Sequence, residues 1–201
     1  NTAIGRLYEN ETWSGAHRIF GSIRIPGGIS LRTLTGAEIM VDRTPVVGEE
    51  SNYFHSLLVQ GFLNAESTRF YLDPSVQNTF WQGIHVEGTA DIQGCTISGA
   101  ERGVTLTHNS VNNVISNNNF SDNLIGLHVL GITQDIEQSN FQNSGAYAIK
   151  EDAGAVINVT SCQFIDNLFD YYDENETVID ITELNGYPNN SGNVSNNGDQ
   201  E

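Results

Sequence analysis

The chain repeats an apolar pair at a nearly constant interval. Four successive stretches carry two apolar residues five positions apart: Ile92/Ile97, Ile115/Phe120, Ile136/Phe141 and Val159/Phe164. The first members follow one another at intervals of 23, 21 and 23 residues. A period near 22 is too short for repeats made of two helices and fits one coil of a solenoid. Because equivalent positions of successive coils stack in rows, a functional site should be visible as a row.

Each coil alternates apolar and polar residues in short runs that are separated by turns rich in Asn, Asp, Ser and Gly, as in NVISNNNFSDNLIGLHV. Alternation bounded by such residues predicts β-strands, and the density of Gly, Asn and β-branched residues excludes a long helical stripe. The earlier half alternates less regularly. Between Trp13 and Leu184 the period leaves room for about eight coils of roughly 22 residues.

Two kinds of segment resemble a known family. TWSGAHRIFGSIRIPGGISLRTLTGAEIMV resembles the opening coil of right-handed parallel β-helix repeat proteins in the pectate-lyase-like superfamily, and SNNNFSDNLIGLHV and CQFIDNLFDYY resemble their repeat. The resemblance covers residues 12–184. It implies an all-β, single-stranded right-handed parallel β-helix and an extracellular or cell-surface location. Since this fold hosts lyases, hydrolases, adhesins and non-catalytic modules, it does not choose among functions.

The domain organisation expected from this pattern is simple. A lead-in over residues 1–12 precedes one β-helix domain over 13–184, and a disordered linker or tail follows over 185–201, where apolar periodicity ends. Such a linker suggests neighbouring domains of a larger protein. The excursion over 42–56 is expected to be a lid or a surface loop. No apolar run is long enough to insert in a membrane.

The formal net charge of −17 and the pI near 4.4 restrict the partners. A surface this acidic argues against nucleic acid and against anionic membranes. It suits solubility outside the cell, and it leaves calcium binding by carboxylates as the one cofactor to consider. Cys95 and Cys162 occupy the same repeat position three coils apart, about 14 Å, which is too far for a disulfide. We predict two free, buried thiols.

Two rows are candidates for chemistry. The turn row contains Asp122 and Asp166, either as part of a ladder of polar turn residues or as a glycosidase acid and base. The outer row of the following strand contains His85, Glu87 and His128, with Lys150 and Asp173 near its end. Histidine or lysine could serve there as the base of a lyase or glycosidase; the alternative is a solvated polar face.

An acidic and aromatic cluster closes the repeat region. Asp170, Asp173, Tyr171 and Tyr172, together with Trp81, are candidates for stacking on a sugar ring and for bonding its hydroxyls. Asp173, Glu174 and Glu176 are candidate calcium ligands. The alternative is a charged last coil that prevents end-to-end association.

The leading hypothesis is a non-catalytic extracellular β-helix module that binds a polysaccharide or forms a structural part of a larger surface or secreted protein. The active-site motifs of polygalacturonases and the arginine-centred motifs of pectate lyases are missing from the sequence. The second hypothesis is a polysaccharide lyase or glycosidase that acts on the outer strand face. The third is adhesion to ice or another surface, for which TLTH at 105–108 is the only T-x-T segment in register.

Overall fold

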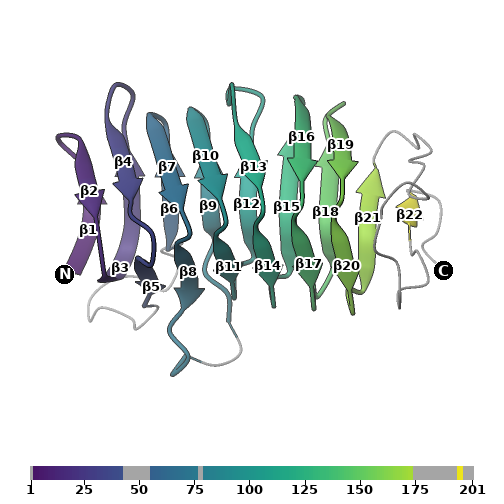
Figure 1. The fold of residues 1–201 in the computed structure, drawn as a ribbon, viewed down its shortest axis with the longest axis horizontal. Coiled ribbons are helices and arrows are strands. Elements are labelled where there is room, and N and C mark those ends of the chain that lie inside the picture. The colour runs from purple at the N-terminus through teal and green to yellow at the C-terminus, as the bar shows by residue number, and fades with distance from the viewer. Residues whose placement is uncertain (1, 43–54, 77–78, 174–193, 197–201) are drawn as a thin grey trace.

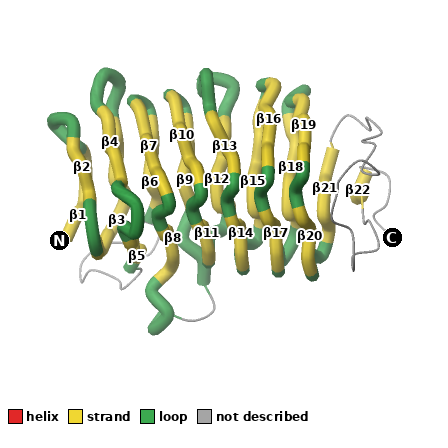
Figure 2. The backbone as a smooth tube through the Cα atoms, viewed as in Figure 1, coloured by secondary structure: helices red, strands yellow, loops and turns green. Residues whose placement is uncertain are grey.

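The chain forms a parallel β-solenoid in a computed structural model that describes residues 2–42, 55–76, 79–173 and 194–196. Successive coils follow one another along the long axis of the molecule (Figure 1). Strands and short turns make up the described chain, and the tube drawing separates them clearly (Figure 2). None of the described residues forms a helix that could cross a membrane. The expected all-β parallel solenoid is therefore confirmed.

Three faces surround the core, and we call them faces 1, 2 and 3. Face 1 is a parallel sheet of seven strands. Its members in spatial order are β2 (Glu11–Trp13), β4 (Ser30–Thr33), β7 (Phe62–Glu66), β10 (Thr89–Gln93), β13 (Val114–Ser116), β16 (Thr133–Glu137) and β19 (Val156–Thr160).

Faces 2 and 3 meet in one long strand, β3 (Ala16–Ile25), whose first half pairs on face 2 and whose second half pairs on face 3. Face 2 continues through β5 (Glu38–Val41), β8 (Arg69–Leu72), β11 (Thr96–Ser98), β14 (Asn119–Ser121), β17 (Asn140–Gln142) and β20 (Gln163–Ile165). Face 3 comprises β1 (Thr2–Arg6), β6 (Ser56–Val59), β9 (Gly83–Val86), β12 (Arg102–Leu106), β15 (Ile125–Leu130), β18 (Tyr147–Asp152), β21 (Phe169–Asp173) and β22 (Val194–Asn196).

The apolar pairs seen in the sequence form the core in the predicted register. Ile92, Ile115, Ile136 and Val159 are successive partners on face 1. Ile97, Phe120, Phe141 and Phe164 are successive partners on face 2. The rings of Phe120 and Phe141 stack with centroids 4.7 Å apart, and those of Phe141 and Phe164 with centroids 5.4 Å apart. Alternation of inward apolar and outward polar residues therefore fixes the register.

The solenoid differs from the expectation in length and at its ends. It has about six turns rather than eight, because the expected number assigned every residue between Trp13 and Leu184 to a coil. Pairing starts before Trp13, since β1 already pairs with β3. Three residues of the expected tail form β22 beside β21. Residues 43–54, which hold most of the expected lid or loop, lie outside the described chain.

Left-handed backbone positions mark two corners of each coil. The first corner, between faces 1 and 2, has positive φ at Ser67, Gly94, Asn117, Gln138 and Ser161. The second corner, between faces 2 and 3, has positive φ at Gly99, Asp122, Asn143 and Asp166. The next residue points inward at each corner. These inward residues include Cys95 and Cys162, which are free and buried as predicted.

The inward residues of the second corner join neighbouring coils. Asn123 accepts a hydrogen bond from the Ala100 N–H and donates one to the Ile97 carbonyl oxygen, both at 2.9 Å. Asn167 makes the same two bonds to Ser144 and Phe141, both at 3.0 Å. Buried backbone groups need such partners, so the amide row confirms the ladder that the turn composition predicted.

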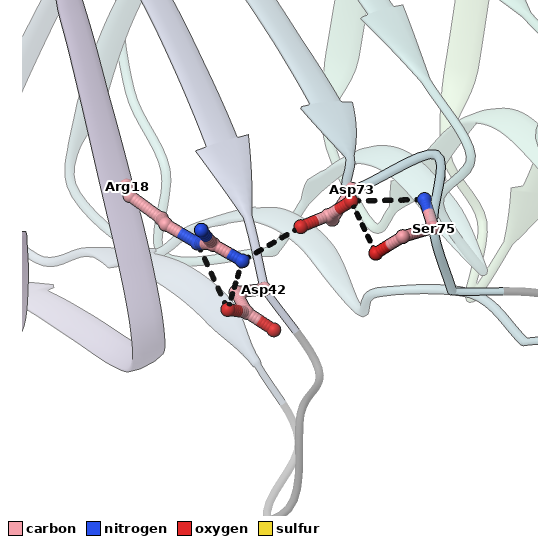
Figure 3. A network of polar contacts seen from close by, with 4 residues as sticks. All are labelled: Arg18, Asp42, Asp73 and Ser75. Atoms are coloured by element: carbon pink, nitrogen blue, oxygen red, sulfur yellow. Dashed lines mark hydrogen bonds and ion pairs between the residues drawn. The ribbon is translucent and has the colours of Figure 1, made fainter.

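Near the N-terminus the same corner contains an ion-pair network (Figure 3). Arg18 on β3 contacts Asp42 Oδ2 through Nη2 at 2.6 Å and Asp73 Oδ2 through the same nitrogen at 2.8 Å. The Ser75 N–H and hydroxyl both donate to the other oxygen of Asp73, at 2.9 and 2.7 Å. Asp42 follows β5 and Asp73 follows β8, so one guanidinium links the C-terminal ends of these two strands.

Candidate functional site

The outer row of face 3 has the register that the sequence predicts. His85, Thr105, His128, Lys150 and Tyr172 are successive Cα partners on β9, β12, β15, β18 and β21. Tyr172, not Asp173, follows Lys150 in the row, because Asp173 pairs with Glu151. Neighbouring strands bring these side chains about 4.8 Å apart, so the C-terminal members form one cluster.

Asp152 joins two members of this row. Its Oδ2 lies 2.7 Å from His128 Nε2 and 2.7 Å from Lys150 Nζ. Asp152 was not predicted as a site residue. The sequence does contain an indication of it, because a residue two positions after Lys150 on the same strand projects from the same face of the sheet. The contact with His128 additionally requires the register between β15 and β18.

His128 is buried, with 6% of its surface exposed. Burial lowers the pKa of its imidazole, and the hydrogen bond to Asp152 opposes that shift only in part. The charges of Lys150 and Arg102 lower the pKa further. A neutral ring whose Nε2 faces a carboxylate carries its proton on Nε2. His128 Nδ1 is buried and has no hydrogen-bond partner among the described residues, so His128 offers no free base to the outer surface.

Aromatic rings border the cluster. The Lys150 ammonium lies 5.2 Å from the centre of the Tyr172 ring. The Tyr147 ring lies 5.1 Å from that of Tyr172 and 5.6 Å from that of Phe169. All three rings are half-buried. We call Asp152, His128, Lys150, Tyr147, Phe169 and Tyr172 the Asp152 cluster.

The N-terminal members of the row form a separate polar chain. His85 Nε2 lies 3.6 Å from Glu87 Oε1. Gln60 Nε2 donates to Glu87 Oε2 at 2.7 Å, and Arg24 Nε donates to Gln60 Oε1 at 2.5 Å. Thr105 separates this chain from the Asp152 cluster and is buried. The structure therefore does not bring His85 and Glu87 together with His128 and Lys150 into one catalytic set.

Several predicted ligand-binding residues lie in the core instead of on the surface. Trp81 is 1% exposed and donates through Nε1 to the Ser98 carbonyl oxygen at 2.8 Å. Tyr171 is 2% exposed, and its hydroxyl donates to Glu151. Asp170 is buried and accepts a bond from Asn167 Nδ2 at 3.1 Å. Because these side chains point inward, they cannot stack on a ligand at the outer surface.

The remaining predicted site residues occupy turns or lie outside the described side chains. Asp122 and Asp166 are exposed second-corner residues with φ of 56° and 52°. Asn143 donates to Asp122 at 3.2 Å, so this aspartate belongs to the turn row. Asp173 is described only in its backbone, and Glu174 and Glu176 lie outside the described chain.

Two further hypotheses lack support among the described residues. His, Cys, Asp and Glu side chains form no group of three or more that could hold a metal ion in the described part of the chain, so calcium is not supported there. Thr105 and Thr107, the T-x-T pair considered for surface adhesion, are both buried. They cannot form a flat exposed row.

Comparison with family models decides the affiliation. The model of the family described as "Periplasmic copper-binding protein (NosD)" matches residues 19–201. The chain belongs to the NosD family. NosD proteins are right-handed parallel β-helices with the pectate-lyase-like fold, as the resemblance implied. The periplasmic description of the NosD family agrees with the expected extracellular or surface location. Comparisons with curated proteins and with solved structures found no match.

Proposed function

We propose that this chain is a non-catalytic β-helix module that binds a saccharide at the Asp152 cluster on face 3. The observation that carries the proposal is a carboxylate held by His128 and Lys150 beside three partly exposed aromatic rings. Saccharide sites combine a ring that stacks on the C–H face of the sugar with polar groups that bond its hydroxyls.

The contacts assign a role to each residue. Asp152 Oδ2 is occupied by His128 and Lys150, so we assign the acceptance of sugar hydroxyls to its other oxygen. Lys150 keeps two further N–H donors beside the Tyr172 ring. His128 is buried and acts on the ligand only by fixing Asp152. Preorganisation of this kind lowers the entropy lost when a ligand binds.

The same contacts favour binding over catalysis. A general base needs an unprotonated nitrogen or oxygen within reach of the substrate proton. His128 has Nε2 engaged and Nδ1 buried, and the Lys150 ammonium is paired with Asp152. Asp152 is the one candidate base left in the cluster, and a glycosidase also needs a second carboxyl group, which the cluster does not contain. The lyase or glycosidase hypothesis is therefore the weaker one, and recovery of the saccharide intact is part of the test.

Copper, which the family name mentions, does not fit the described residues. Copper is bound in proteins chiefly by His, Cys and Met side chains, as in sites of two His and one Cys with a weak axial Met. All such residues of the sequence lie in the described ranges, namely His17, His55, His85, His108, His128, Cys95, Cys162 and Met40. Within these ranges, no three His, Cys, Asp or Glu side chains lie close enough together to hold a metal ion. Both thiols are buried, and burial raises the pKa of Cys95 to about 11. We therefore propose a polysaccharide, and not copper, as the ligand of this chain. That neighbouring domains are its partners remains a prediction.

The test is retention of the purified chain on a panel of immobilised plant, algal and bacterial polysaccharides, with and without calcium. We expect one glycan class to retain the chain and to be recovered intact. Asp152→Asn and Tyr172→Ala should abolish retention. Tyr8→Ala is the matched control, because Tyr8 is 86% exposed and lies far from the cluster in the chain. Equal retention of all variants, or a shortened glycan, would contradict the proposal.

A further inference from the structure

Face 1 carries a groove that is separate from the Asp152 cluster. It lies over β7 and β10, extends to Arg32 on β4 and Asn117 after β13, and has a volume of about 430 Å³. Ligand pockets of proteins span about 300–1,000 Å³, so the groove has room for a small ligand. Its residues are on another face from Lys150 and Tyr172, so the groove is independent of the proposed function.

One residue creates the hollow. Gly94 is a first-corner residue with positive φ and has no side chain, whereas Ser67 precedes it in the row and Asn117 follows it. All three line the groove and are exposed. The missing side chain therefore opens a gap between two polar neighbours of the same row.

The walls of the groove are polar and nearly balanced in charge. Arg32, Asn64 and Asp91 are register partners on β4, β7 and β10, and Glu66 pairs with Gln93 in the adjacent row. Gln93 Nε2 donates to Asp91 Oδ1 at 2.7 Å, which orients that carboxylate. No aromatic ring lines the groove.

The lining chemistry selects the ligand. Carboxylates and amide oxygens accept hydrogen bonds, and the guanidinium and amide nitrogens donate them. Glu66 and Asp91 disfavour an anion, and Arg32 disfavours a cation. We infer that the Gly94 groove is a binding site for a neutral, hydroxyl-rich saccharide unit, held through its hydroxyl edges and not by ring stacking.

The experiment is a titration of the ¹⁵N-labelled chain with neutral hexasaccharides of glucose, mannose and xylose, each followed by amide chemical shifts. We expect at least one of them to shift the amides of Glu66, Gln93 and Gly94 in a saturable manner. Absence of groove shifts with all three at millimolar concentration would overturn the inference. Shifts with calcium alone would replace the saccharide by a cation and would also overturn it.

Gly94→Asn is the decisive variant. Asparagine tolerates positive φ and stands at the equivalent position in Asn117. The nearest atom to an added Cβ is Ser67 Oγ at 3.2 Å, which is a side-chain end that can rotate. We expect the apparent affinity to fall about tenfold or more, with no change in Tm. Unchanged affinity would contradict the inference.

Two further variants secure the interpretation. Gly154→Asn introduces the same side chain at φ of 73°, with nothing within 4 Å, and should bind as the unaltered chain does. If Gly94→Asn lowers Tm, Glu66→Gln replaces it, because Glu66 is exposed and its change should weaken binding without unfolding. Tyr172→Ala should leave the saccharide-induced chemical-shift changes of the groove amides unchanged. The Gly94 groove and the Asp152 cluster are therefore tested separately.

Discussion

The second corner is built in two ways along one row. Extending the register between β5 and β8 by one residue places Asp42 beside Asp73. Extending that between β8 and β11 by two residues places Asp73 beside Ala100. The same position continues through Asn123, Ser144 and Asn167. The N-terminal coils thus put carboxylates where the C-terminal coils put small or amide side chains.

The difference follows from how the chain leaves each coil. In the C-terminal half a single left-handed residue turns the chain, and an asparagine satisfies the backbone of the preceding coil. In the N-terminal half 14 residues separate β5 from β6 and 10 separate β8 from β9, and Arg18, from another strand, neutralises two buried acids. The same repeat position is therefore stacked in both halves. It holds a carboxylate where a long connection follows and a small or amide side chain where a short one follows.

The largest expected effect is in the amide half. Asn123→Leu removes both bonds, so the buried Ala100 N–H loses its acceptor and the Ile97 carbonyl oxygen loses the Asn123 donor. At 1–3 kcal/mol for each such group, the free energy of unfolding should fall by about 3 kcal/mol. Urea denaturation measures it. A loss below about 0.5 kcal/mol would mean that water replaces the amide and that the row is not a structural ladder.

The acidic half should respond less strongly to loss of its cation. Arg18→Met leaves the buried Asp42 without its guanidinium partner, but Arg18 is 43% exposed, so solvent moderates the loss. We expect a loss of about 2 kcal/mol. Arg32→Met is the control, since Arg32 is exposed on face 1. Equal stability of the two variants would remove the contrast between the halves.

The two halves should also differ in their response to acid. Bonds from the Ser75 N–H and hydroxyl, aided by Arg18, lower the pKa of Asp73. A carboxyl group whose pKa is lower in the folded than in the unfolded state stabilises the folded chain. This contribution is fully present at a pH above the pKa of the unfolded state, which is near 4. It is lost as the pH falls through the lower pKa of the folded state. Asp73→Asn should lower Tm at pH 7 and approach the unaltered chain in acid. A constant Tm difference across the whole range would contradict this.

The smallest effect is expected at the left-handed positions themselves. Asn143 is exposed, and its side chain makes one bond to Asp122 at 3.2 Å. Its backbone φ of 55° suits glycine as well as asparagine. Asn143→Gly should change the unfolding free energy by less than about 0.5 kcal/mol. A loss comparable to that of Asn123→Leu would show that the exposed side chains also hold the corner.

The sequence predicts the repeated part of this fold well because one coil specifies the next. The pairing of Ile115 with Ile136 and of Phe120 with Phe141 follows from period and alternation alone. The number of coils was overestimated, because dividing the span from Trp13 to Leu184 by the period assigns every residue to a coil. The Arg18 network joins residues 24 and 55 positions apart, and no local pattern indicates such contacts.

The candidate site was predicted only in part, for a physical reason. The sequence predicts His128 and Lys150 because they occupy the same position in successive coils. To predict Asp152, one must know that it projects from the same face of β18 as Lys150 and that the pairing of β15 with β18 brings it to His128. Tyr171 and Tyr172 look equivalent in the sequence. Tyr171 pairs with Ile149 and is buried, whereas Tyr172 pairs with Lys150 and faces outward. A shift of one residue along a strand exchanges core and surface.

The stacked rings of Phe120, Phe141 and Phe164 have a consequence for how the molecule could change its size. A duplicated coil, such as residues 115–135 inserted in tandem, would bring its own phenylalanine to the stack, its own asparagine to the corner, and about 4.8 Å of additional rod. Duplicating the coil that contains Asp42 would add a carboxylate to a network with one guanidinium. Gain and loss of whole repeats should therefore be tolerated in the C-terminal half, while the N-terminal half keeps a fixed number of coils.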